Sequence, residues 1–77
     1  VNDDLDVEIE DLIAAAKADL VLSGVKSEMV TDEDPLIKRA VILYCKGHFG
    51  YDDMGVRFED AYKSLKNHMV LSVEYGG

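Results

Sequence analysis

Apolar residues recur at helical spacing in three stretches of the chain, and the first stretch predicts a helix over about residues 5–22. Its apolar positions, separated by steps of four, three, one, three and four residues, are Leu5, Ile9, Leu12, Ile13, Ala16 and Leu20. This spacing puts them on one side of a helix. Asp3, Asp4 or Asp6 can cap its start, and Gly24 can end it in the left-handed conformation.

The second stretch predicts a helix over about residues 35–48, which begins at an Asp-Pro pair. Asp34 is a suitable cap, and Pro35 fits the first helical position because it has no backbone N–H to satisfy there. Apolar residues between Leu36 and Cys45 occupy nearly every face. A helix of this kind is central and contacts its neighbours on several sides.

The third stretch predicts a helix over about residues 56–71, in which Phe58, Tyr62, Leu65 and Met69 are spaced by four, three and four. We expect a turn at residues 51–55 before it and a loop at residues 25–33. Residues 70–75 are the one candidate strand. Three helices with short connections predict an all-α fold, a small antiparallel three-helix bundle, as a single domain over residues 1–77.

The composition excludes several classes of protein. The 77 residues contain 16 acidic and 8 basic side chains, a net charge of −8, which argues against a protein that wraps nucleic acid. Cys45 is the one cysteine of the sequence, so no internal disulfide can form. No apolar run reaches the roughly 18 residues that a membrane helix needs.

The charge is segregated along the chain. Residues 1–34 have a net charge of −9, whereas residues 35–77 have a net charge of +1. Unlike ends of this kind favour head-to-tail stacking of identical molecules. The alternative is an acidic face that keeps the protein soluble.

Candidate catalytic and metal sites are weak. Cys45 and His48 are three residues apart on one predicted helix, which would suit a thiol nucleophile and its base, but no third group orients the histidine. A zinc site would need His68 and Asp52 as further ligands. Zinc sites typically combine two close pairs of ligands, and here only Cys45 and His48 form such a pair. The acidic pairs lack the loop pattern of a calcium site. We therefore expect no catalytic residue, no metal, no cofactor and no enzyme activity.

Two stretches of the chain have a distinctive wording, residues 34–52 (DPLIKRAVILYCKGHFGYD) and residues 57–66 (RFEDAYKSLK). They resemble the small head–tail connector (head-completion, adaptor) proteins of tailed bacteriophages and prophages. The acidic run before Ile9 and the segment at residues 13–17 (IAAAK) add to the resemblance. It extends over about residues 3–72, and its strongest part is the central helix with its His-Phe-Gly turn.

The resemblance implies a structural protein of the virion. Members of this family are helical and assemble as a ring, typically a dodecamer, beneath the portal protein of a DNA-filled head. They extend the DNA channel, which DNA passes without specific binding, and dock the next head-completion or tail protein. No enzyme activity, cofactor or membrane is involved. The resemblance places the protein at the head–tail junction, and in the host cytoplasm during assembly. It also implies a further helix before Val1.

A ring needs two unlike faces on each subunit, and the segregated charges supply them. We expect four acidic residues of one subunit to contact four basic residues of the neighbouring subunit. The acids are Asp3, Asp4, Asp6 and Glu10, and the bases are Lys38, Arg39, Lys46 and Lys63. Phe49 and Tyr51, in the turn after the second helix, are candidate anchors for a protein partner.

The alternative function is an acidic inhibitor that mimics DNA and binds a basic enzyme. Its carboxylates should extend along one long face. In this sequence they thin out after Asp34, which counts against the alternative.

Overall fold

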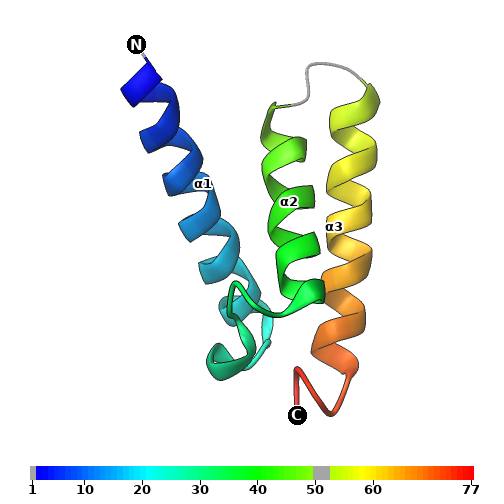
Figure 1. Cartoon of the computed structure of the whole chain (residues 1–77). Coiled ribbons are helices and arrows are strands. Elements are labelled where there is room, and N and C mark those ends of the chain that lie inside the picture. The colour runs from blue at the N-terminus through cyan, green and yellow to red at the C-terminus, as the bar shows by residue number, and fades with distance from the viewer. Residues whose placement is uncertain (1, 50–52) are drawn as a thin grey trace.

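Figure 1 shows the computed structural model, which describes the backbone of residues 2–49 and 53–77 and the side chains of residues 8–48 and 55–77. The α-helices are α1 (Asn2–Ser23), α2 (Pro35–Phe49) and α3 (Asp53–Leu71), and a short 3-10 helix, η1 (Ser27–Met29), follows α1. Neighbouring helices run antiparallel, and α2 lies between α1 and α3 (Figure 1). The all-α three-helix bundle is therefore confirmed.

Three local expectations were wrong. Because α1 begins at Asn2, the backbone of Asp3, Asp4 and Asp6 lies inside its first two turns rather than before the helix. Acidic residues suit this end of the helix dipole. The turn before α3 is shorter than expected, since the helix begins at Asp53. No strand forms among the described residues, and the candidate segment at residues 70–75 instead ends α3 and turns back.

The core lies where the three helices converge. Its buried residues are Ala16, Leu20, Val25, Ile37, Ala40, Leu43, Tyr62, Met69 and Tyr75. Along α2, buried positions recur every three or four residues, at Ile37, Ala40, Leu43 and Gly47, so one face of this helix packs inward. Gly47 lets α2 and α3 come close, because a Cβ atom there would lie 2.8 Å from Cγ of Glu59.

Only the second half of the α1 apolar stripe is fully buried. Ala16 and Leu20 have no exposed surface, whereas Leu12 and Ile13 are half-buried and 37% of Ile9 is exposed. Figure 1 shows the reason, since the N-terminal half of α1 inclines away from the hairpin of α2 and α3. The stripe that the sequence assigned to the core is therefore still accessible at one end.

The C-terminal turn is fastened to the start of α2. The Asp34 carboxylate accepts backbone hydrogen bonds from Leu36 (2.9 Å) and Ile37 (3.2 Å), so the predicted cap is confirmed. The Tyr75 hydroxyl donates to the same carboxylate, with O–O distances of 3.0 and 2.9 Å. The backbone N–H of Lys26 donates to the Tyr75 carbonyl at 2.7 Å. One tyrosine thus joins the loop after α1, the start of α2 and the chain end.

Gly24 ends α1 as predicted. Its φ of +119° is rarely adopted by residues with a side chain. This conformation lets the N–H of Val25 donate to the carbonyl of Leu20 at 3.0 Å, as in a Schellman motif. A Cβ atom at Gly24 would lie 3.3 Å from the side chain of Val70, so the ends of α1 and α3 are in close contact.

We expect Tyr75→Phe to lower the free energy of unfolding by about 1 kcal/mol, because it removes a hydrogen bond to a carboxylate while keeping the buried ring. Asp34→Ala should cost about 1–2 kcal/mol, since the cap is lost as well. Urea unfolding followed by circular dichroism measures both. The double variant should lose less than the two single losses combined, because both remove the same bond. Strict additivity would contradict the fastening described above.

Candidate functional site

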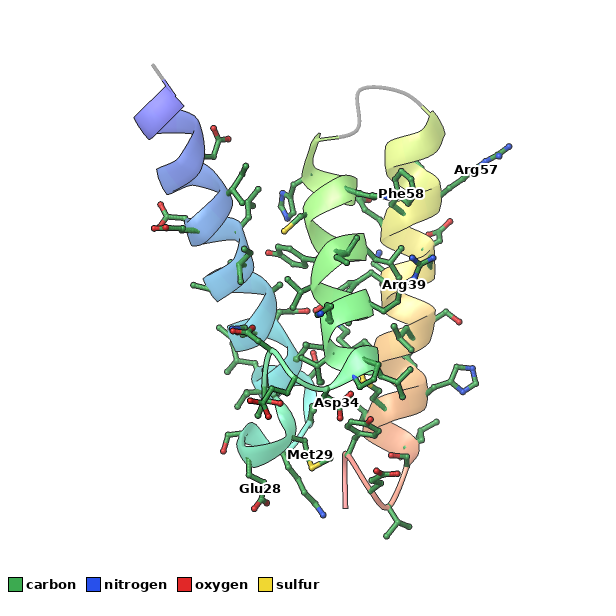
Figure 2. The ribbon with its side chains drawn as sticks, in the orientation of Figure 1. Glu28, Met29, Asp34, Arg39, Arg57 and Phe58 are labelled. Carbon is green, nitrogen blue, oxygen red and sulfur yellow. The ribbon has the colours of Figure 1, made fainter. Side chains whose placement is uncertain are left out.

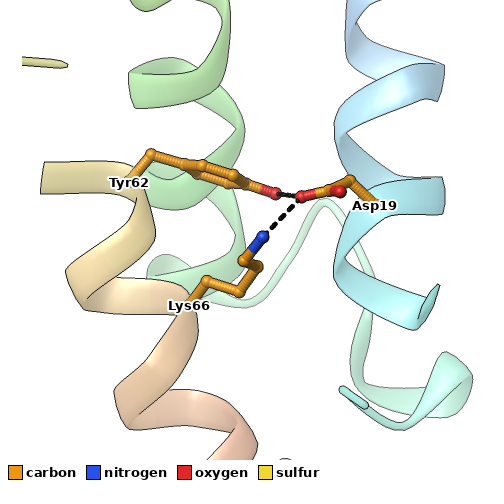
Figure 3. Close-up of polar contacts among 3 residues, drawn as sticks. All are labelled: Asp19, Tyr62 and Lys66. Carbon is orange, nitrogen blue, oxygen red and sulfur yellow. Dashed lines mark hydrogen bonds and ion pairs between the residues drawn. The ribbon is translucent and has the colours of Figure 1, made fainter. Parts of the chain in front are cut away.

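A polar contact crosses the bundle between α1 and α3. The Tyr62 hydroxyl donates to Oδ2 of Asp19 at 2.5 Å, and Nζ of Lys66 lies 3.0 Å from the same oxygen (Figure 3). The ring of Tyr62 is buried. Asp19 is the one acid in the second half of α1, and its carboxylate is satisfied by two partners from α3.

The contact shifts the pKa of both acidic partners. The hydrogen bond from Tyr62, aided by Lys66, lowers the pKa of Asp19 below its usual range although partial burial opposes this. Burial raises the pKa of Tyr62, and the hydrogen bond to Asp19 and its negative charge raise it further. At neutral pH the pair is therefore a carboxylate and a neutral phenol.

A pocket of about 280 Å³ adjoins this contact, since Asp19, Tyr62 and Lys66 all line it. Tyr44 and His48 from α2 line it together with charged residues of α3. The Tyr44 ring stands edge-on to Tyr62, with centroids 5.2 Å apart, and it also contacts the His48 ring at 4.5 Å. The pocket is an aromatic surface with charges of both signs at its rim.

The thiol–histidine pair that the sequence suggested is not an activated dyad. Burial raises the pKa of Cys45, which favours the unreactive thiol over the thiolate. His48 lies against the ring of Tyr44 instead. The arrangement is that of a half-buried cysteine on a packed helix.

The suggested zinc ligands lie at different ends of the molecule. His48 is near the end of α2, whereas His68 shares a shallow surface with Leu36, at the beginning of that helix. Twelve residues of helix separate the two sites, which is about 18 Å. Asp52 lies outside the described residues. Across residues 8–48 and 55–77, no group of three His, Cys, Asp or Glu side chains is placed to hold a metal.

The predicted interface bases fall on two different surfaces. Lys38, Arg39 and Lys46 are exposed on α2, and Nζ of Lys46 lies 5.3 Å above the Phe58 ring of α3. Lys63 is exposed on α3 and lines the pocket beside Asp19. Arg39 and Phe58 are marked in Figure 2. Three of the four predicted bases therefore lie on α2, and the fourth lies on α3.

The predicted acids belong to the inclined half of α1. Glu10 is exposed there. The side chains of Asp3, Asp4 and Asp6 lie outside the described residues, although their backbone is helical. Of the predicted partner anchors, the Phe49 side chain and the whole of Tyr51 also lie outside them.

Sequence reasoning missed an apolar groove on the outer face of α1. It has a volume of about 520 Å³ and is lined by Lys17, Ala18, Val21, Leu22, Ser27 and Val30. The signal was present, because residues 12–22 are apolar on nearly every face of the helix. The Asp19 contact was missed as well, since nothing in the spacing links it to α3.

Within the described residues, no helix is long and apolar enough to cross a membrane.

Comparison with known proteins gives one finding about the family. A family model described as phage connector protein matches residues 1–76. Neither a curated protein nor a solved structure matches the chain.

We expect Tyr62→Phe to lower the free energy of unfolding at neutral pH by about 1–2 kcal/mol, because Asp19 loses a donor. The raised pKa of Tyr62 also predicts a pH dependence. The contribution of the Tyr62 hydroxyl to the free energy of unfolding is complete below the unfolded-state pKa of about 10. It falls above that pH, because the unfolded chain then releases a proton that the folded chain keeps.

Chemical denaturation at a series of alkaline pH values measures this dependence. Wild-type protein should lose stability above pH 10 more steeply than Tyr62→Phe, by up to about 1.4 kcal/mol per pH unit. Asp19→Asn keeps the phenol but removes the negative charge, so its slope should be intermediate. Equal slopes in all three proteins would contradict the assigned contact.

Proposed function

The chain belongs to the phage connector protein family, and we propose that it forms a ring under the portal protein and joins the DNA-filled head to the tail. The family identifies a structural phage protein that interacts with other head or tail proteins of the virion. The match over residues 1–76 is the observation that supports the proposal most strongly, because it extends over nearly the whole chain.

The fold supports a ring through its unlike faces. The first half of α1, residues 2–11, contains six acidic residues and no basic one. By contrast, α2 contains three Lys or Arg residues and no acid. Because the acidic half of α1 inclines away from the hairpin (Figure 1), a neighbouring molecule can reach it. Contacts between different faces of identical subunits close into rings when the rotation permits.

We assign the subunit contact to two groups of residues. The acids Asp3, Asp4, Asp6 and Glu10 of one subunit face the bases Lys38, Arg39 and Lys46 on α2 of the next. Lys63, on its separate surface, contributes at the rim. Each exposed ion pair is worth about 0–1 kcal/mol, so several must act together. The ring is a dodecamer on the portal, and its channel lets DNA pass without specific contacts.

The proposed function also requires contacts with the neighbouring proteins of the virion. Phe49 and Tyr51, at the connection between α2 and α3, are the proposed anchors for the portal or for a downstream head-completion or tail protein. Assembly takes place in the host cytoplasm and ends at the head–tail junction. The exposed bases on α2 favour this function over a DNA mimic, whose surface would be acidic along a whole face.

Reversing the charge of a base on α2 should weaken assembly. We expect Lys38→Glu and Arg39→Glu each to lower the association constant up to about fivefold at low ionic strength. The effect should shrink as salt is added, because exposed charges are screened. Sedimentation velocity over a range of protein concentrations measures the association.

Arg57→Glu is the matched control, since it makes the same change in charge. Arg57 is exposed on α3 and projects away from the bundle (Figure 2). It should leave assembly unchanged. Glu10→Lys mixed with Lys38→Glu should recover part of the lost association. Unchanged assembly of both α2 variants at low salt would refute the proposed pairing.

The function itself is tested by deleting the gene from an inducible strain and viewing the lysate by electron microscopy. We expect DNA-leaking heads and free tails, with whole virions restored when the gene is supplied. A deletion that leaves whole, infectious virions would overturn the connector function.

A further inference from the structure

The outer face of α1 has an apolar groove that nothing in the described chain fills. Leu22 is 86% exposed, and Val21 beside it is 42% exposed. Together with Ala18 and Val30 they form the floor of the 520 Å³ groove. A solvent-facing helix surface normally carries polar residues, so an apolar one of this size marks a contact surface.

A matching apolar projection lies at the end of α3. Leu71 and Val73 are each 84% exposed, and Glu74 follows them. On α3 Leu71 points away from the side on which Tyr62 and Met69 are buried, because it lies two residues beyond Met69 on the helix. Two hydrogen bonds support the turn that carries Val73. The Tyr75 N–H donates to the Ser72 hydroxyl, and Nζ of Lys26 donates to the Val73 carbonyl.

The groove and the projection lie at the same level of the bundle. The end of α1 contacts α3 at Val70, next to Leu71, as the 3.3 Å approach at Gly24 shows. The Lys26 N–H to Tyr75 carbonyl bond links the following residues at the same level. In Figure 1, α1 and α3 flank α2. The exposed residues of the two features lie away from the buried positions of their helices, such as Leu20 and Met69.

We propose that the groove on α1 receives Leu71 and Val73 of a second copy of this chain. The contact is heterologous, because the groove of one subunit meets the projection of the next. Such contacts close into a ring without a helical rise when the two surfaces lie level along the axis. This inference rests on the proposed ring and assigns its apolar contact.

The charged residues beside the groove and the projection also favour a second copy of this chain as the occupant of the groove. Lys17, at the rim of the groove, is the one basic residue in α1. It lies 2.6 Å from Asp32, a mostly exposed carboxylate. Glu74 of the neighbouring copy adjoins Val73 and would bring a second carboxylate to this lysine.

Two charged variants that each disable one surface test the proposal. Leu22→Glu blocks the groove, and Leu71→Glu blocks the projection. We expect each to lower self-association roughly tenfold or more, because a charge replaces an apolar side chain in the contact. An equimolar mixture should form dimers of twice the 8.5 kDa chain mass and nothing larger, since it has one intact groove and one intact projection per pair. Analytical ultracentrifugation measures both.

Val56→Glu is the matched control. Val56 is another exposed apolar residue of α3, near the opposite end of that helix. It should assemble as the wild type does. Circular dichroism and thermal unfolding establish that all three variants fold.

Several outcomes would overturn the proposal. They are a wild-type chain that stays monomeric up to its solubility limit, variants that assemble normally, and a mixture that remains monomeric. If Leu22→Glu assembles normally but fails to rescue the deletion strain, the groove binds another virion protein instead of a second copy. Each of these results leaves the connector function standing, because that function depends on the deletion phenotype alone.

Discussion

The carboxylate of Asp34 holds together the end of the bundle at which α1 and α3 finish and α2 begins. It satisfies the first backbone donors of α2 and accepts the Tyr75 hydroxyl at the same time. Tyr75 in turn accepts from the backbone of Lys26 and completes the core. A chain of 77 residues has little apolar surface to bury. The hydrogen bonds of Tyr75 therefore hold the turn at residues 72–77 over the core at this end of the three-helix bundle.

At the opposite end of the bundle, the N-terminal half of α1 is not packed closely against the other two helices. Beyond Ala16, toward the N-terminus, α1 inclines away from the hairpin, and the apolar stripe that begins at Ile9 is only partly covered. The backbone of the acidic half of α1 is thereby held away from α2. In the proposed ring, the bases of a neighbouring subunit would contact this half.

The small number of helices also explains the exposed apolar residues near the end of α1. Val21 and Leu22 lie on the side of α1 opposite to Ala16 and Leu20, and a single layer of helices cannot bury both sides. Such a surface suits a protein that functions as one subunit among many. In the proposed ring, ion pairs would set the orientation of neighbouring subunits and the apolar contact would supply affinity.

The sequence by itself determined the three helices, the cap at Asp34, the glycine end of α1 and the family. These features depend on local spacing or on residue types at fixed positions, which neighbours in the chain control. It did not determine the Asp19–Tyr62 contact, the inclination of α1, the folded-back C-terminal turn or the groove at Leu22. Each of these depends on how helices distant in sequence pack. Only the tertiary structure decided which apolar faces were buried, because that choice follows from the angles between helices rather than from the periodicity within each one.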